Sequence, residues 1–284
     1  MASNLTLIID CHAICHAAKH TMGDLSYEEQ KVGIIFGFMK QLLSLAKRFE
    51  TNSFLFCWDS KKSYRRNIYP NYKNRPQRSE EEYRFDKFAF KQFIELRMWT
   101  LPKFGFKNNF IQTGLEADDI IAAITQNYDR EFVIISGDND LYQLLSPNVS
   151  MYSTKSKKLT THESFTGKWG VSPSEWVMVK QIAGCRSDTV EGVVGVAEKT
   201  AIKYLTGKLG KETKTYAIIG NSKYIIERNE QLVKLPFTGT KIPKIYDNET
   251  FNFADFTEIV NKYGFYSFQQ TEAANSWIYY FKME

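Results

Sequence analysis

Long apolar runs are missing from this chain of 284 residues, and we expect no secretion-type leader. Nowhere do about 18 apolar residues follow one another, which is the length that a membrane-spanning helix needs. The start, MASNLTLIID, lacks the basic region and apolar centre of a signal peptide. We therefore expect a soluble protein without a membrane partner, located in the cytoplasm, or in the host cytoplasm if a phage encodes it.

Cysteine is also scarce, with only Cys11, Cys15, Cys57 and Cys185 in the whole chain. Four cysteines cannot form a disulfide framework for a chain of this length, and three of them lie in or beside apolar segments, so we expect reduced thiols. The segment CHAICH suggests zinc ligands, but no second cysteine or histidine pair with finger spacing follows. We interpret it as packing at a strand-to-helix junction.

Acidic residues are absent from residues 60–78, SKKSYRRNIYPNYKNRPQR. Seven residues of this basic stretch are lysine or arginine and three are tyrosine, whereas the formal net charge of the chain is only +5. Cations bind phosphates and aromatic rings stack on unpaired bases, so the stretch indicates a single-stranded nucleic acid. A solvated basic helix is the alternative. Pro70 and Pro76 argue against one continuous helix.

What the sequence does contain is a series of short, β-rich apolar runs that end in aspartate. LTLIID ends at Asp10, FLFCWD ends at Asp59, and FVIISGDND ends at Asp138 and Asp140. Continuous apolar runs of this length are typical of strands buried on both faces.

Helical patterns separate these strands, over residues 28–49 and 116–128, and residues 108–114 resemble a further strand. Alternation of strands and helices predicts right-handed crossovers. The expected fold class is therefore α/β, with a central, mostly parallel sheet and helices on both faces.

Acidic side chains from distant parts of the chain should meet at one edge of this sheet. The carboxyl ends of parallel strands lie together, and the segment GLEADD adds Glu116, Asp118 and Asp119 at the start of the helix that follows the fourth strand. Each motif alone fits ordinary turn or helix-dipole chemistry. Together, so many like charges within several ångströms require a cation. Oxygen ligands favour Mg²⁺, with Mn²⁺ as a substitute, and two ions about 4 Å apart are expected.

A glycine-rich turn follows in QIAGCRSDTVEGVVGVAEKTAIKYL, residues 181–205. Gly192 and Gly195 precede a helix that begins near Glu198, so backbone N–H groups could bind a phosphate there, with Lys199 and Lys203 adding charge. A tight turn between closely packed helices is an equally good interpretation of the glycines.

These motifs, in this order, resemble the 5′-nuclease superfamily, specifically phage flap endonucleases and the 5′-exonuclease domain of bacterial DNA polymerase I. The resemblance extends from residue 5 to about residue 205, and its most specific parts are GLEADD, ISGDND and SDTVEGVVGVAEKTA. It implies a PIN-like fold, a helical arch at about residues 61–102 and a helix-turn-helix-type DNA-binding region. We expect residues 1–180 to form the nuclease core. Residues 181–284 should form the DNA-binding region and a C-terminal segment packed on the core.

The resemblance also implies roles for particular residues. Metal ligands are expected at eight acids: Asp10, Asp59, Glu116, Asp118, Asp119, Asp138, Asp140 and Asp188. Catalysis is expected to depend on Lys73 and Arg75, which would stabilise the scissile phosphate, and on Asp10 and Asp138. DNA contacts are expected from eleven residues: Lys61, Lys62, Arg65, Arg66, Tyr72, Lys73, Arg78, Gly192, Gly195, Lys199 and Lys203. A K⁺ ion at the glycine-rich turn is a further expectation.

The chain departs from the family pattern at Cys185. The family usually has G-D-x-x-D before the glycine-rich turn, whereas this chain has GCRSD, so a neutral thiol replaces the first aspartate. A thiol is a poor Mg²⁺ ligand, and Arg186 adds positive charge beside it, so we expect a weakened second metal site. The motif Y-K-N-R at residues 72–75 is also one residue shorter than usual.

The predicted function is a Mg²⁺-dependent 5′-nuclease that cuts DNA near junctions of single and double strands, as in phage or bacterial replication. The expected partner is branched DNA with a 5′ single-stranded end, with RNA–DNA hybrids and replication proteins as further candidates, and the expected state is a monomer. One alternative is a branched-DNA binding protein that has lost cleavage because of Cys185. Another is a PIN-type ribonuclease, although such domains are shorter and lack the basic stretch and the glycine-rich turn.

Overall fold

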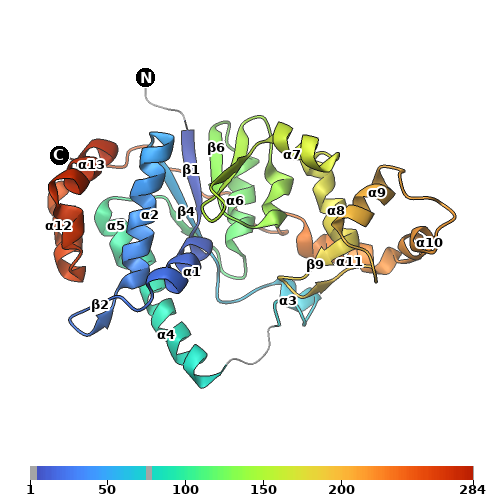
Figure 1. Cartoon of the computed structure of the whole chain (residues 1–284), viewed down its shortest axis with the longest axis horizontal. Coiled ribbons are helices and arrows are strands. Elements are labelled where there is room, and N and C mark those ends of the chain that lie inside the picture. Colours follow the sequence, from blue (N-terminus) through green and yellow to red (C-terminus); the bar gives the residue numbers. More distant parts are fainter. Residues whose placement is uncertain (1–4, 75–78, 284) are drawn as a thin grey trace.

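A six-stranded sheet forms the centre of the computed structural model, which describes residues 5–74 and 79–283 (Figure 1). Its strand order is β5-β4-β1-β6-β7-β8, and all neighbours are parallel except β7 and β8. The strands are β1 (Leu5–Asp10), β4 (Phe54–Trp58), β5 (Asn109–Ile111), β6 (Glu131–Ile135), β7 (Val149–Ser153) and β8 (Lys158–Thr160). The prediction of a mostly parallel sheet is confirmed, and the β7–β8 hairpin was not predicted.

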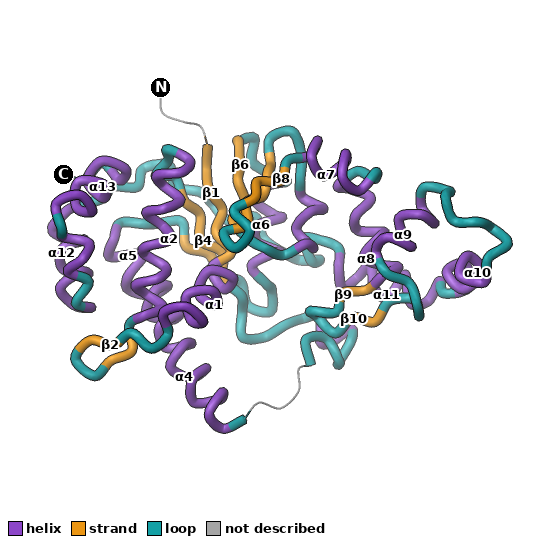
Figure 2. The backbone as a smooth tube through the Cα atoms, viewed as in Figure 1, coloured by secondary structure: helices purple, strands orange, loops and turns teal. Residues whose placement is uncertain are grey.

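Helices cover both faces of the sheet, as expected (Figures 1 and 2). Side chains alternate along each strand, so Leu7 and Ile9 of β1 enter one core while Ile8 enters the other. The first core is covered by α1 (Cys11–Met22), α2 (Gly33–Phe49) and α5 (Leu101–Phe104). The second is covered by α6 (Ala117–Thr125), α7 (His162–Trp169) and α8 (Trp176–Ala183). Burial on both faces explains why the strands are continuous apolar runs.

Helix α2 begins five residues later than the predicted helix over residues 28–49. The preceding residues form a hairpin of β2 (Ser26–Tyr27) and β3 (Gln30–Lys31). Glu28 and Glu29 reverse the chain there with left-handed φ values of 46° and 63°. Such values are incompatible with a right-handed helix, which explains the later start.

The basic stretch and the residues after it form separate helical segments next to the carboxyl ends of the strands (Figure 2). They are α3 (Arg65–Ile68) and α4 (Glu80–Glu95), and α4 continues through a π-helical turn, Leu96–Thr100, into α5. Helix α3 ends before Pro70, in agreement with the prediction that no continuous helix spans this stretch. Arg75, Pro76 and Arg78 lie outside the described residues.

The C-terminal part begins with the two-stranded ribbon of β9 (Gly184–Cys185) and β10 (Val190–Glu191). The helices α9 (Glu198–Leu205), α10 (Lys214–Asn221) and α11 (Lys223–Val233) follow. Residues 234–252 then cross to the β5 side, where α12 (Phe253–Tyr263) and α13 (Thr271–Phe281) pack against α5 and α2. In the part of the chain that the structure describes, we find no helix with both the length and the apolar character needed to cross a bilayer.

Candidate metal centre

Three predicted aspartates are held at strand ends by backbone contacts. Asp10, the last residue of β1, accepts a hydrogen bond from the N–H of Ala13 at 3.1 Å and thereby caps α1. Asp59 follows β4 and accepts from the N–H of Ala117 at 2.8 Å. Asp138 follows β6 and accepts from the N–H of Asp140 at 2.8 Å. The residues after each strand therefore fix the direction of its terminal carboxylate.

Four carboxylates, Asp10, Asp59, Asp118 and Asp138, form what we call the first acid group. They influence one another electrostatically, and within residues 5–74 and 79–283 no lysine or arginine forms an ion pair with any of them. Burial and the nearby Asp59 raise the pKa of Asp10 to about 7. Burial and Asp140 raise the pKa of Asp138 to about 6. Burial, followed by Asp138, also raises the pKa of Asp118 well above its ordinary value.

This chemistry fits a divalent cation. Oxygen donors that repel one another in a buried place lose that repulsion when a small dipositive ion lies among them. A carboxylate-rich donor set with no sulfur favours Mg²⁺ or Mn²⁺. The first acid group therefore has the donor chemistry of a magnesium-type site.

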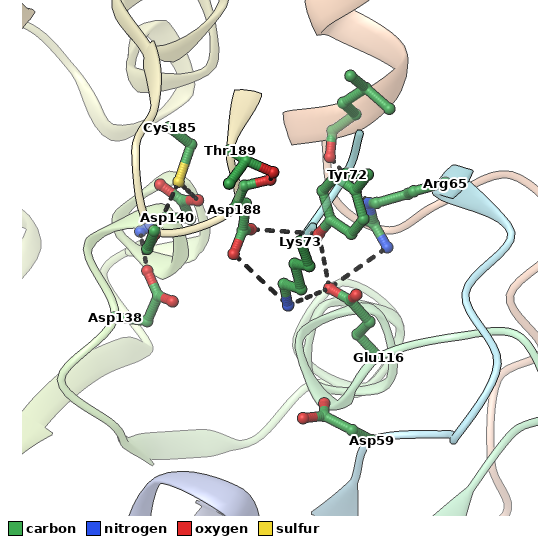
Figure 3. Close-up of polar contacts among 12 residues, drawn as sticks. Asp59, Arg65, Tyr72, Lys73, Glu116, Asp138, Asp140, Cys185, Asp188 and Thr189 are labelled. Carbon is green, nitrogen blue, oxygen red and sulfur yellow. Dashed lines mark hydrogen bonds and ion pairs between the residues drawn. The ribbon is translucent and has the colours of Figure 1, made fainter. Parts of the chain in front are cut away.

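Lys73 lies between Glu116 and Asp188 and forms ion pairs with both (Figure 3). Its Nζ lies 2.9 Å from Oε2 of Glu116 and 3.6 Å from Oδ1 of Asp188. Burial lowers the pKa of Lys73, but Glu116 and Asp188 more than compensate and raise it above its ordinary value. Because its pKa is raised, this ammonium group stays charged. Its side chain is 30% exposed and therefore remains accessible from solvent.

Asp140, Cys185 and Asp188 form what we call the second acid group, with one ligand atom from each residue within 4.8 Å of the others. Cys185 Sγ donates to Oδ2 of Asp140 at 3.1 Å, and Lys180 Nζ lies 3.0 Å from Oδ1 of the same residue. Burial, then Asp140 and Asp188, raises the pKa of Cys185 to about 12, so the thiol is neutral. This group already contains a cation and a hydrogen-bond donor.

The structure corrects the roles of Asp119 and Arg65. Arg65 donates two hydrogen bonds of 2.7 Å to the two carboxylate oxygens of Asp119, and both side chains are buried. Asp119 also accepts from the N–H groups of Glu116 and Phe237, while Nε of Arg65 donates to the carbonyl of Leu232. Asp119 is therefore half of an internal ion pair rather than a metal ligand, and Arg65 does not face a phosphate.

Tyr72 also differs from its predicted role as a platform for bases. Its side chain is only 2% exposed, and its hydroxyl donates to Glu116 at 2.9 Å and lies 3.2 Å from Oδ2 of Asp188. A buried ring offers no face to a base, so Tyr72 supports the acids instead. Lys61, Lys62 and Arg66 are exposed, and their contact with DNA stays a prediction.

The glycine-rich turn lies beside the second acid group. Residues 189–197 and Arg186 line a surface pocket of about 680 Å³. Gly195 has a φ of +74°, and a Cβ at Gly192 would lie 2.3 Å from the carbonyl oxygen of Ala183, so both positions require glycine. Lys199 and Lys203 of α9 are exposed next to this turn. DNA and K⁺ binding there stay predictions.

Two residues close to the acids were missed by sequence reasoning. Lys180 is the one charged residue of the apolar helix WVMVKQIA, and this was the only signal that it is buried against an acid. Nδ1 of His12 accepts the N–H of Asp59 at 3.2 Å, and the CHAICH motif carried no signal of this contact.

Comparisons with known proteins agree with this geometry. Residues 5–170 match the family described as 5′-3′ exonuclease, N-terminal resolvase-like domain. The chain is 28% identical over 222 residues to a 5′-3′ exonuclease of Buchnera aphidicola subsp. Schizaphis graminum, covering 76% of this chain and 70% of the relative. It is also 28% identical over 203 residues to the thermostable DNA polymerase I of Thermus filiformis, covering 70% of this chain. The matched region spans only 23% of that polymerase.

Solved structures share the fold. The T5 D15 protein crystallised with metal ions superposes with a TM-score of 0.71 at 24% identity, over 82% of this chain and 90% of that one. The bacteriophage T5 D15 flap endonuclease in complex with DNA and metal ions gives a TM-score of 0.69 at 24% identity, over 82% of this chain and 89% of that one. The catalytic core of Rad2 with DNA substrate gives 0.57 at 14% identity, over 98% of this chain and 93% of that one. The expected fold class is confirmed.

Proposed function

Because the chain belongs to the family of 5′-3′ exonuclease N-terminal, resolvase-like domains, we propose that it is a metal-dependent, structure-specific 5′-nuclease. Its substrate is DNA with a junction of single and double strands, and its reactions are flap cleavage and 5′-3′ exonucleolytic hydrolysis. The observation that carries the proposal is the first acid group, whose four carboxylates influence one another electrostatically and have no lysine or arginine ion-pair partner among the described residues.

Asp10, Asp59, Asp118 and Asp138 are the residues that would hold the ion, with Mg²⁺ as the expected metal and Mn²⁺ as a substitute. When bound, such an ion lowers the pKa of its water and neutralises charge on a phosphate oxygen. Hydrogen bonds from Ser136 and Ala13 hold the Asp10 carboxylate in place at 2.8 and 3.1 Å. These two contacts fix the orientation of the Asp10 carboxylate.

Lys73 supplies the second part of the chemistry. Glu116 and Asp188 hold its ammonium group beside the first acid group, and its partial exposure leaves it accessible to a phosphate. A fixed positive charge stabilises the negative charge that develops on a phosphate during hydrolysis. Arg75, which was predicted to assist, lies outside the described residues.

Two exposed cationic regions support binding of a DNA junction. One contains Lys61, Lys62 and Arg66 next to the strand ends, and the other contains Lys199 and Lys203 beside the glycine-rich turn. Phosphate neutralisation by such groups drives binding that is independent of base sequence. The flap endonuclease and Rad2 structures contain DNA, which favours DNA as the partner of this chain as well.

A cleavage assay on matched substrates tests the proposal. We would label the 5′ end of a flap duplex, a nicked duplex and an RNA–DNA hybrid, and measure product lengths with Mg²⁺. A single product cut near the base of the flap is expected, and short products from the nicked duplex would show the exonuclease reaction. Products from the hybrid would extend the proposal to removal of RNA primers in replication.

Two results would contradict it. Tight binding of the flap duplex without product at any Mg²⁺ or Mn²⁺ concentration would favour the branched-DNA binding protein, which the neutral thiol of Cys185 makes the second candidate. Cleavage of RNA flaps alone would favour a PIN-type ribonuclease.

A further inference from the structure

The second acid group does not fit a second Mg²⁺ ion. Oδ2 of Asp140 accepts a hydrogen bond from Cys185 Sγ at 3.1 Å, and Oδ1, which accepts no hydrogen bond from the described residues, forms an ion pair with Lys180 Nζ at 3.0 Å. Asp188 has the hydroxyl of Tyr72 at 3.2 Å and the ammonium group of Lys73 at 3.6 Å. A hard ion would have to displace a buried ammonium group and accept a sulfur in place of a carboxylate oxygen, and it prefers neither.

The charges lead to the same conclusion. This group has two carboxylates, Asp140 and Asp188, and one of their partners, Lys180, is a full positive charge beside Asp140. An aspartate at position 185 would have added a third carboxylate, but cysteine supplies a sulfur in its place. The charge available to attract a dipositive ion is therefore smaller than in the first acid group, where four carboxylates have no such partner among the described residues.

We propose that Lys180 takes the place of a second divalent ion in this chain, so that the centre operates with one ion and one buried ammonium group. This inference rests on the proposed nuclease function and concerns how the same site is built. Lys180 is only 5% exposed, and its Nζ also lies 3.7 Å from Glu198 at the start of α9. Its helix, α8, is anchored by the buried side chains of Trp176, Val179 and Ile182.

Lys180 is a positioning residue, because it acts through Asp140. The N–H of Asp140 donates to Oδ1 of Asp138 at 2.8 Å, and Asp138 belongs to the first acid group. The ammonium group thus holds the short helix, Asn139–Leu144, on which Asp140 lies. A chain of contacts from Lys180 to Asp140 to Asp138 links the lysine to the ion-binding carboxylates.

The number of bound ions tests this inference without any measurement of cleavage. Mn²⁺ is titrated into the metal-free full-length protein, and free Mn²⁺ is followed by electron paramagnetic resonance. One tightly bound Mn²⁺ per chain is expected. Two ions of similar affinity in the unaltered protein would overturn the inference.

Substitutions at position 185 identify the cause. Cys185→Asp should add a second, weaker Mn²⁺ site, whereas the matched control Cys185→Ser, which changes the side chain without adding charge, should still bind one ion. If Cys185→Asp also binds one ion, the thiol is not what excludes the second ion, and the inference fails.

Lys180→Met, combined with Cys185→Asp, tests the lysine. Because the ammonium group competes with the ion for Asp140, its removal should tighten the second Mn²⁺ site at least 10-fold relative to Cys185→Asp alone. An unchanged affinity would overturn the role of Lys180, and if the double variant fails to fold, Lys180→Gln with Cys185→Asp is titrated in the same way. Failure of the proposed function would look different, because one ion would bind but the flap duplex would stay uncut.

Discussion

The two acid groups lie side by side at one edge of the sheet, yet their charges are compensated in different ways. The first leaves four carboxylates without a lysine or arginine partner in the described part of the chain, and burial and nearby carboxylates raise the pKa values of Asp10, Asp118 and Asp138. The second pairs Asp140 with Lys180 and Asp188 with Lys73. The comparison teaches that a count of acids in the sequence does not show how each is compensated, since some carboxylates have an internal cation and others do not.

Asp138→Asn should give the largest effect, because it removes a donor from the first acid group. We expect cleavage of the flap duplex to fall at least about 1000-fold, since removal of a metal ligand abolishes the activation of water. In the absence of metal, the same change should stabilise the fold by up to about 3 kcal/mol, because the pKa of Asp138 is raised from 3.8 to about 6. Urea unfolding in EDTA measures this gain.

The exposed Asp129→Asn is the matched control and should change neither quantity. A loss of stability in Asp138→Asn without metal would show that the first acid group is not under electrostatic strain.

Arg65→Met removes the cation that pairs with the buried carboxylate of Asp119. It should lower the free energy of unfolding by about 3–5 kcal/mol, because it leaves Asp119 charged, buried and unpaired. Removing both partners, as Arg65→Met with Asp119→Leu, should recover part of that loss. Urea denaturation decides, with the exposed Lys62→Met as a control that should stay within about 0.5 kcal/mol of the parent. Equal stability of Arg65→Met and the parent would remove the distinction between paired and unpaired acids.

Lys73→Ala tests the cation that lies between the two groups. We expect cleavage to slow about 100-fold, because a charge that stabilises the reacting phosphate is lost, while the dissociation constant for the flap duplex changes only a few-fold. Lys61→Ala is the comparison, since an exposed phosphate contact should weaken binding and leave the rate of bound substrate unchanged. Equal losses of rate and binding in Lys73→Ala would make it an anchor for DNA.

The pH dependence of stability tests Asp10 of the first acid group. Asp10 has a pKa of about 7 in the folded protein and an ordinary value of 3.8 when unfolded, so between these values the folded state holds a proton that the unfolded state has released. Metal-free protein should therefore lose stability as the pH rises from about 4 to about 7, by at most about 1.4 kcal/mol per pH unit for this group. Denaturation at pH 5 and pH 8, in EDTA and in Mg²⁺, measures this. Constant stability without metal would contradict the raised pKa.

Much of the fold and the position of the candidate site could be predicted from local patterns. Runs such as LTLIID and FLFCWD are continuous because their strands are buried on both faces, and the aspartate that ends each run marks the carboxyl edge. Parallel pairing then brings Asp10 and Asp59 together whatever the detail of the intervening helices.

The partner of each charge could not be predicted in this way. Arg65 belongs to an acid-free stretch, which suggested a surface that binds phosphate, yet α3 packs against α11 and directs this side chain to Asp119, 54 residues away. Lys180 and Asp140 are likewise distant in sequence and meet because α8 packs on the short helix after β6. Such pairs depend on tertiary packing, of which a linear pattern contains no record.

The segment at residues 234–252 has a consequence for anyone who shortens this chain. Amide side chains of Asn108 and Gln112 bind the backbone of Tyr246 and Lys241, so this segment occupies the side of β5 where a further strand would pair. Trp277 of α13 also packs on Phe104 of α5. A fragment ending near residue 205 would expose both an unpaired strand edge and an aromatic surface, and we expect it to aggregate in the absence of the remaining residues.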